Sequence, residues 1–180
     1  MPNRINNIHD KFIKELLSDK EVAIAFLEEY LPSDLRNVIN FQTLHYEDTT
    51  YLTKELSASF SDLVWTVQTF NNERLKVCLL LEHKSYIDEN VPFQLLEYLA
   101  LAYQKQIKNK KQIELIVPIL YYHGKQKWDF KKFTSFFESY PDNFKRYLPG
   151  FENEFIDLNA LKAEQIMALK HGMLRGALLL

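Results

Sequence analysis

LLLEHKSYIDENVPFQLLEY, residues 79–98, joins an apolar strand pattern directly to a helical one. Three leucines lead straight into Glu82, His83 and Lys84. A strand that only fills a core is expected to end at a turn residue. This one ends at groups that bind metal ions or move protons. Because side chains alternate along a strand, Glu82 and Lys84 share one face and His83 points to the other.

The segments on either side of "NNE" predict a β-hairpin. "ASFSDLVWTVQTF" and "RLKVCLLLEHKSY" are rich in β-branched and aromatic residues, and Asn tolerates the positive φ that a tight turn needs. A turn centred on Asn71 and Asn72 sets Asp62 opposite Leu81 or Glu82. In the second register the Cβ atoms of the two carboxylates lie about 5 Å apart.

Two carboxylates at that distance repel each other. A divalent cation bound between them would offset this repulsion, and the pair would then form a metal-binding site. Hard cations such as Mg²⁺ take one or two protein carboxylates and leave the other positions to water and substrate phosphate. Lys84 would then reach a metal-bound water or a phosphate oxygen. The alternative is an exposed Asp62 at a strand start and a solvated pair of Glu82 and Lys84. These residues alone favour that alternative.

The remaining patterns place helices around the hairpin. A first helix lies in "HDKFIKELL", and a capping box at Ser18 and Glu21 starts a second helix, which ends at Pro32. "LHYEDTTYLTKEL" stays open between strand and loop. A long helix follows Pro92, "IELIVPILYYHG" is a further strand, and "ALKAEQIMALKHGMLRGALLL" is a terminal helix. This order predicts an α/β fold with a mixed central sheet flanked by helices.

Composition predicts one domain, spanning residues 1–180. The chain is 47% hydrophobic, which is enough for one core. Its net charge of −2 excludes binding of nucleic acid through bulk charge, so DNA contact needs a local patch. The single cysteine, Cys78, fits a reducing compartment. We find no signal-peptide pattern and no run of about 18 apolar residues, and we expect a cytoplasmic protein without a membrane partner.

An Asp, a spacer and then Glu-x-Lys at a strand end resembles the PD-(D/E)XK nuclease superfamily, although Ser61 replaces its proline. Gln94 and Tyr98 resemble the Gln-x-x-x-Tyr element of its RecB-like members. The order of helix, hairpin, helix and strand also agrees. The resemblance implies a restriction-endonuclease-like fold.

Five motifs are similar to the Rpn family of recombination-promoting nucleases or transposase-like proteins. They occur in the family's order between His9 and Trp128: "HDKFIKELL", "FLEEYLP", "SDLVWTV", "LLLEHKSYIDENVPFQLLEY" and "VPILYYHGKQKW". Lys84 stands where many members carry Gln after Glu-His, which brings the chain nearer to the full nuclease pattern. Members are usually longer, so the apolar end "GALLL" leaves open a short or a trimmed member. A C-terminal region and a homo-oligomer therefore stay open.

The resemblance implies a metal-dependent DNA endonuclease that hydrolyses phosphodiester bonds in recombination or transposon-like DNA. Asp62 and Glu82 would hold Mg²⁺ or Mn²⁺, with the carbonyl of His83 as a further ligand, and the metal would lower the pKa of a water. Lys84 would orient that water or stabilise the pentacovalent phosphate. We expect these side chains to converge in a cleft open to solvent. The alternative is a non-catalytic nuclease-fold protein that binds DNA or a partner chain as a regulator.

Other residues are candidates for supporting roles. His9 and Asp10 either approach the site as auxiliary groups, or Asp10 caps a helix that begins at Lys11. Gln94 and Tyr98 either contact DNA or form a helix face with Tyr98 half in the core.

Two lysine runs are candidates for DNA phosphate contacts, which need clustered cations and no sequence code. The run in "KQIKNKKQ" lies about 20 Å along the long helix, at 1.5 Å per residue, and is expected to be away from the chemistry. The favoured run is interleaved with the aromatic residues of "KQKWDFKKF" and consists of Lys125, Lys127, Lys131 and Lys132. A solvated face is the commoner reading of such runs.

Overall fold

The computed structural model describes residues 4–82, 87–110, 112–123 and 126–157 of the chain, and the side chains of residues 4–10 and 82 are not part of that description. Its helices are α1 (Arg4–Leu17), α2 (Lys20–Tyr30), α3 (Ser33–Arg36), α4 (Val91–Lys108) and α5 (Asp142–Lys145), with short 3₁₀ helices η1 (Leu56–Ala58) and η2 (Phe133–Phe137). Its strands are β1 (Ile39–Glu47), β2 (Phe60–Thr69), β3 (Arg74–Glu82), β4 (Leu115–Tyr122) and β5 (Glu154–Asp157).

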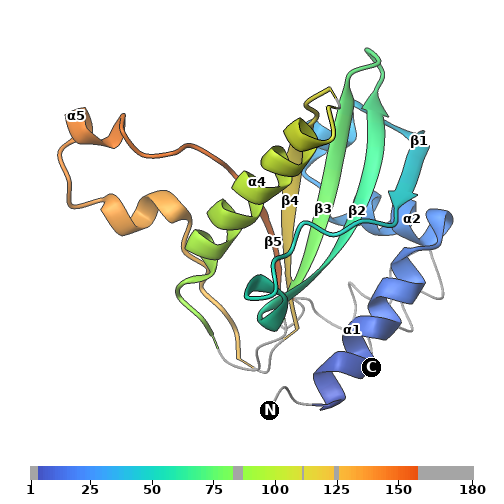
Figure 1. Cartoon of the computed structure of the whole chain (residues 1–180), viewed down its shortest axis with the longest axis horizontal. Coiled ribbons are helices and arrows are strands. Elements are labelled where there is room, and N and C mark those ends of the chain that lie inside the picture. The colour runs from blue at the N-terminus through green and yellow to red at the C-terminus, as the bar shows by residue number, and fades with distance from the viewer. Residues whose placement is uncertain (1–3, 83–86, 111, 124–125, 158–180) are drawn as a thin grey trace.

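The described strands form one five-stranded mixed sheet in the order β1-β2-β3-β4-β5. The β1–β2 and β2–β3 pairs are antiparallel, whereas β3–β4 and β4–β5 are parallel. Parallel neighbours need a crossover connection, and α4 provides it between β3 and β4 (Figure 1). The predicted α/β, restriction-endonuclease-like architecture is confirmed. The sequence patterns missed β5, because four residues carry too little alternation to recognise.

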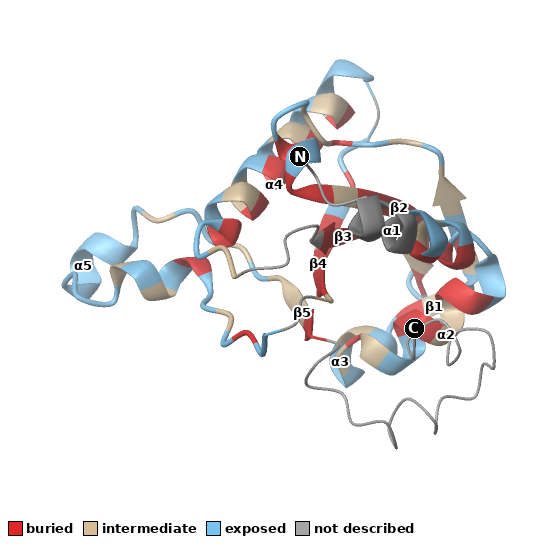
Figure 2. Ribbon diagram, turned by 90° about the horizontal axis from the view of Figure 1, so that it is seen from below, coloured by how far each residue is buried: buried red, intermediate tan, exposed pale blue. Residues whose placement is uncertain are grey.

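Helices cover both faces of the sheet, so each face has its own apolar core. On one face, α1 and α2 pack against side chains such as Leu63, Leu79 and Tyr121. On the other face, α4 packs against Phe60 and Leu80. Figure 2 shows the strands largely buried and α5 largely exposed. Because β2 is covered on both sides, the polar residues Asp62, Thr66 and Thr69 within it are buried.

The β2–β3 loop has one residue more than the sequence indicated. The Thr69 amide donates to the Glu73 carbonyl over 2.8 Å, and the Asn72 amide donates to the Thr69 carbonyl over 2.9 Å. Asn72 has a φ of 65°. This is a type I turn followed by a left-handed residue, which makes a three-residue hairpin loop.

The longer loop shifts the strand register, so the expected pairing of Asp62 was wrong. Asp62 pairs with Leu80, not with Leu81 or Glu82, and Glu82 pairs with Phe60. Since residues two apart share a face, the Asp62 and Glu82 positions still belong to the same face, the one under α4. They are diagonal rather than direct neighbours.

Two expected helix starts are corrected. The N-cap of α2 is Asp19, whose Oδ1 accepts hydrogen bonds from the amides of Glu21 and Val22 at 2.9 and 3.1 Å. Ser18 therefore does not cap it. Asp10 lies inside α1 and does not cap a helix at Lys11. Within the described ranges, none of the helices has the length and apolar composition that a bilayer crossing requires.

Candidate active site

Asp62 is a buried carboxylate with three hydrogen-bond donors around it. It is 4% exposed. Its Oδ1 accepts from the Thr50 hydroxyl at 2.7 Å, and its Oδ2 accepts from the Tyr51 amide at 2.9 Å and the Tyr98 hydroxyl at 3.1 Å. A carboxylate removed from water needs such donors. They hold the side chain of Asp62 in one orientation beneath α4.

The segment after β1 covers Asp62 and explains its depth. Tyr51 is buried in the core under α4, and its ring meets the Tyr98 ring edge-on at 5.9 Å. This packing sets the Thr50 hydroxyl and the Tyr51 amide against the carboxylate. The expectation of an open cleft was therefore wrong for Asp62, and so was the alternative of an exposed strand start.

Lys105 holds the same segment from the other side. Its Nζ donates to the Thr50 carbonyl at 2.7 Å and to the Thr49 hydroxyl at 2.9 Å, and it lies 5.4 Å from the centre of the Tyr51 ring. This is a cation–π contact combined with two hydrogen bonds. The lysine run at the end of α4 was expected to lie away from the candidate catalytic residues. Lys105, however, contacts Thr50, and Thr50 in turn donates a hydrogen bond to Asp62. Sequence reasoning missed Thr50 and Tyr51 and considered Lys105 only as part of a basic run, because no local pattern marks the contacts of these residues with the site.

Tyr98 is fully buried rather than half in the core. Burial, followed by the nearby Cys78 and Asp62, raises the pKa of Tyr98 well above its ordinary value. Its hydroxyl therefore stays protonated and serves as a donor to Asp62. Gln94 lies one helical turn earlier, and its buried Oε1 has no hydrogen-bond partner among the described residues.

The structure describes the backbone of Glu82 but not Lys84. The Glu82 backbone ends β3, and its position is diagonal to Asp62, a relation that separates Cβ atoms by about 7 Å. The side chain of Glu82 and the whole of Lys84 lie outside the described residues. Their convergence with Asp62 stays a prediction.

The donor chemistry of Asp62 fits a hard divalent cation. Each carboxylate oxygen has two lone pairs, and among the described residues Oδ1 accepts one hydrogen bond, from Thr50. Within the described part of the chain no group of three or more His, Cys, Asp or Glu residues is able to hold a metal ion. A cation at Asp62 would therefore need Glu82 and water as its further ligands, which is the coordination that Mg²⁺ prefers.

For the candidate auxiliary residues His9 and Asp10, the structure describes the backbone only. His9 and Asp10 lie in α1, with side chains outside the description. That helix packs through Ile13 and Leu17 against the face opposite to Asp62.

The lysines predicted to contact DNA do not behave alike. Lys127 and Lys131 are exposed, whereas Lys132 pairs with Glu152 at 2.5 Å. The hydrogen bond from Lys132 to Glu152 raises the pKa of this lysine. Lys125 lies outside the described residues.

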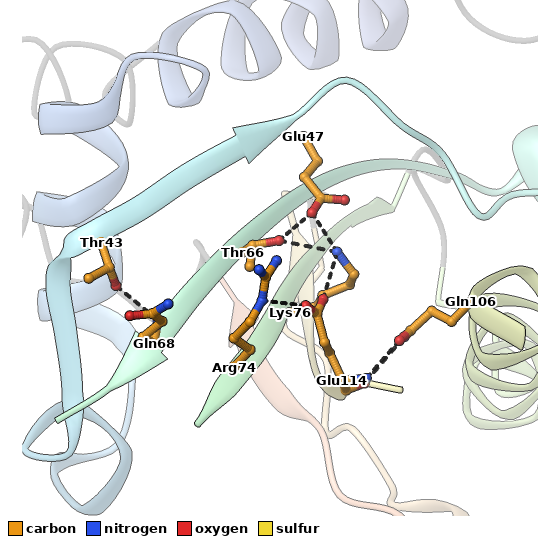
Figure 3. Close-up of polar contacts among 8 residues, drawn as sticks. All are labelled: Thr43, Glu47, Thr66, Gln68, Arg74, Lys76, Gln106 and Glu114. Atoms are coloured by element: carbon orange, nitrogen blue, oxygen red, sulfur yellow. Dashed lines mark hydrogen bonds and ion pairs between the residues drawn. The ribbon is translucent and has the colours of Figure 1, made fainter. Parts of the chain in front are cut away.

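A second buried polar cluster surrounds Lys76 and is structural (Figure 3). Lys76 is 2% exposed, and its Nζ contacts Glu47 at 2.6 Å, Thr66 at 3.1 Å and Glu114 at 3.1 Å. Gln106 of α4 exchanges two hydrogen bonds with the backbone of Glu114. An ammonium group has three donors. Lys76 uses all of them within the protein, so it has none left for a substrate.

The comparison with known proteins agrees with these features. The chain matches the sequence model of the family described as "Putative transposase, YhgA-like" over residues 7–179. This chain belongs to that family.

The relatives carry the names expected from the five motifs. The chain is 38% identical over 117 residues to "Inactive recombination-promoting nuclease-like protein RpnE" of Escherichia coli (strain K12), a match that covers 64% of this chain and 39% of that relative. It is 31% identical over 118 residues to "Recombination-promoting nuclease RpnD" of Escherichia coli O157:H7, covering 64% and 45%. It is 30% identical over 117 residues to "Recombination-promoting nuclease RpnA" of strain K12, covering 64% and 40%.

Membership of the Rpn family is thereby confirmed. The match spans less than half the length of these three relatives. No solved structure matches the chain.

Proposed function

We propose that the chain is a metal-dependent DNA endonuclease that hydrolyses phosphodiester bonds in a recombination-linked process. The observation that carries the proposal is the Asp62 carboxylate, buried and oriented by Thr50, Tyr51 and Tyr98. Its place on the same sheet face as the Glu82 position supports a shared cation. The names of the relatives RpnD and RpnA support nuclease chemistry.

Each residue has a distinct role in this proposal. Asp62 and Glu82 would hold Mg²⁺ or Mn²⁺, which when bound would supply positive charge and lower the pKa of a water molecule. The Tyr51 amide and the Tyr98 hydroxyl both donate to Oδ2 of Asp62, which would leave Oδ1 as the oxygen available to a cation. The role of Lys84 in this proposal is to stabilise the negative charge of the scissile phosphate.

A second candidate function is favoured by one specific observation. RpnE, at 38% identity, carries the word "inactive" in its name. In this alternative the chain is a non-catalytic nuclease-fold protein that binds DNA or a partner chain as a regulator.

Nicking of supercoiled plasmid distinguishes the two functions. We expect wild-type protein to nick with Mg²⁺ or Mn²⁺ and not with chelator, and Asp62→Asn to be inactive. Asp48→Asn is the matched control, because Asp48 is an exposed carboxylate near the same segment. Titration calorimetry with Mn²⁺ adds a readout independent of cutting. If Asp62→Asn loses the Mn²⁺ binding heat and Asp48→Asn keeps it, the result supports the metal site. If wild-type protein neither binds Mn²⁺ nor nicks the plasmid, the result supports the regulator function.

A further inference from the structure

A hollow of about 260 Å³ lies at the start of α4, apart from the residues that surround Asp62. One side comes from the chain before and at the start of α4, including Glu89 and Pro92. The other side comes from residues 127–131 after β4, and Phe136 of η2 closes the rim. The strand end at Glu82 and the start of α4 are joined by the chain that contributes Glu89. Glu89 of the hollow is therefore close to Glu82 in the sequence.

The aromatic wall of the hollow is rigid. Trp128 is 6% exposed and meets the rings of Tyr122 and Phe155 edge-on at 4.9 and 5.5 Å. Its amide donates to Asp157 at 3.1 Å. Phe130 stacks on Phe155 at 4.8 Å with an interplanar angle of 23°. These contacts hold the wall in place before any ligand arrives, which lowers the entropic cost of binding.

Charged groups alternate with these rings along "KWDFK". Lys127, Asp129 and Lys131 are exposed, whereas Trp128 is buried and Phe130 half-buried. Neither Lys127 nor Lys131 makes an ion pair with another described residue, in contrast to Lys132 with Glu152. The hollow thus combines aromatic side chains, two cations without an ion pair among the described residues, and the carboxylates of Glu89 and Asp129.

We propose that this hollow binds one unpaired nucleobase of a DNA strand, with the flanking phosphates on Lys127 and Lys131. The inference rests on the proposed function and narrows its substrate to DNA with an unpaired stretch. Bases in a duplex have both faces stacked, so only an unpaired base offers a face to an aromatic wall. The volume lies just under the range of about 300–1,000 Å³ for drug-sized ligands and suits a single base.

The carboxylates add a preference among bases. Asp and Glu accept hydrogen bonds from exocyclic amino groups such as N4 of cytosine, and thymine has no exocyclic amine. Glu89 and Asp129 therefore favour cytosine over thymine in the hollow.

Tryptophan fluorescence tests this binding without any cutting. The chain has two tryptophans, and Trp65 is buried in the core on the opposite face of the sheet, so quenching by a short oligonucleotide reports Trp128. In chelator, we expect hexadeoxycytidylate to quench and to bind more tightly than hexathymidylate. A blunt duplex should not quench. Phe136→Ala should weaken hexadeoxycytidylate binding about fivefold or more, the loss typical of one base–aromatic stack.

The cations are tested by salt dependence. Lys127→Ala combined with Lys131→Ala should reduce the slope of log affinity against log salt by about 1.4, or 0.7 for each single-strand phosphate contact. Lys11→Ala combined with Lys54→Ala removes the same charge from exposed sites outside both lysine runs and should leave the slope unchanged.

Three results would each overturn the assignment: no quenching by hexadeoxycytidylate, equal binding of hexathymidylate, or tighter binding of the matching RNA. The outcome is separable from that of the proposed function. Quenching without metal-dependent nicking sinks the endonuclease proposal alone. Nicking without quenching sinks the nucleobase site alone.

Discussion

The hydroxyl of Tyr98 donates a hydrogen bond across 3.1 Å to Oδ2 of Asp62, and so joins helix α4 to strand β2 inside the core. Both residues are buried, at 0% and 4% exposure. The contact gives the Gln-x-x-x-Tyr element a concrete role in this chain, since its tyrosine orients the candidate metal ligand.

Tyr98→Phe removes one of the donors to a buried carboxylate. We expect the free energy of unfolding to fall by about 2 kcal/mol, the usual cost of losing a hydrogen bond to a charged group. Nicking should fall as well, because Asp62 is then free to turn. Urea unfolding measures the first effect. Tyr140→Phe, at an exposed tyrosine, is the control, and equal stability of the two variants would contradict the prediction.

Lys105→Met removes the brace on the segment that covers Asp62. Its side chain keeps its apolar length but loses the hydrogen bonds to Thr49 and Thr50. We expect weaker Mn²⁺ binding, and a loss of about 1 kcal/mol of stability. A double-mutant cycle with Thr50→Val should be non-additive by about 0.5 kcal/mol or more, because the two residues share one path to Asp62. Strict additivity, or an equal effect of Lys108→Met, would show that the brace is not specific.

Lys76→Met should destabilise the fold without touching the candidate site. Removing the ammonium leaves Glu47 and Glu114 facing each other without their shared cation. Breaking a buried ion pair by removing one partner costs about 3–5 kcal/mol. Thermal unfolding at neutral pH measures the loss, with the exposed Lys54→Met as reference. Mn²⁺ affinity of the folded variant should equal that of wild type, and a large drop would place Lys76 in the metal site.

Stability should decline on the alkaline side because of Cys78. Burial raises the pKa of its thiol to about 12. A raised folded-state pKa means that the unfolded chain releases its proton first, so stability is complete below the unfolded pKa and is lost as the pH rises. Between pH 8 and 10.5, wild type should lose about 2 kcal/mol more than Cys78→Ala. Urea unfolding at the two pH values gives the difference, and parallel losses would show that the thiol titrates alike in both states.

Local patterns in the chain predicted the elements that depend on neighbouring residues. The strand patterns of β2 and β3 and the further strand in "IELIVPILYY" appear as expected, and α4 begins at Val91, one residue before the Pro92 that marked its start. The motifs also pointed to the family. Such patterns involve residues only a few positions apart, so they can be recognised in the sequence. The hairpin register was missed because a left-handed Asn72 adds one residue to the loop, a choice that the dipeptide Asn-Asn leaves open.

The depth of Asp62 and the identity of its partners were decided only when the helix packed on the sheet. Tyr98 is 36 residues from Asp62, and Lys105 is 55 residues from Thr50. Contacts at such separations follow from the burial of apolar surface under α4, which draws the segment after β1 across the end of β2. The residue types at the site were therefore readable from the chain, whereas their hydrogen bonds and burial depended on long-range packing that no local pattern encodes.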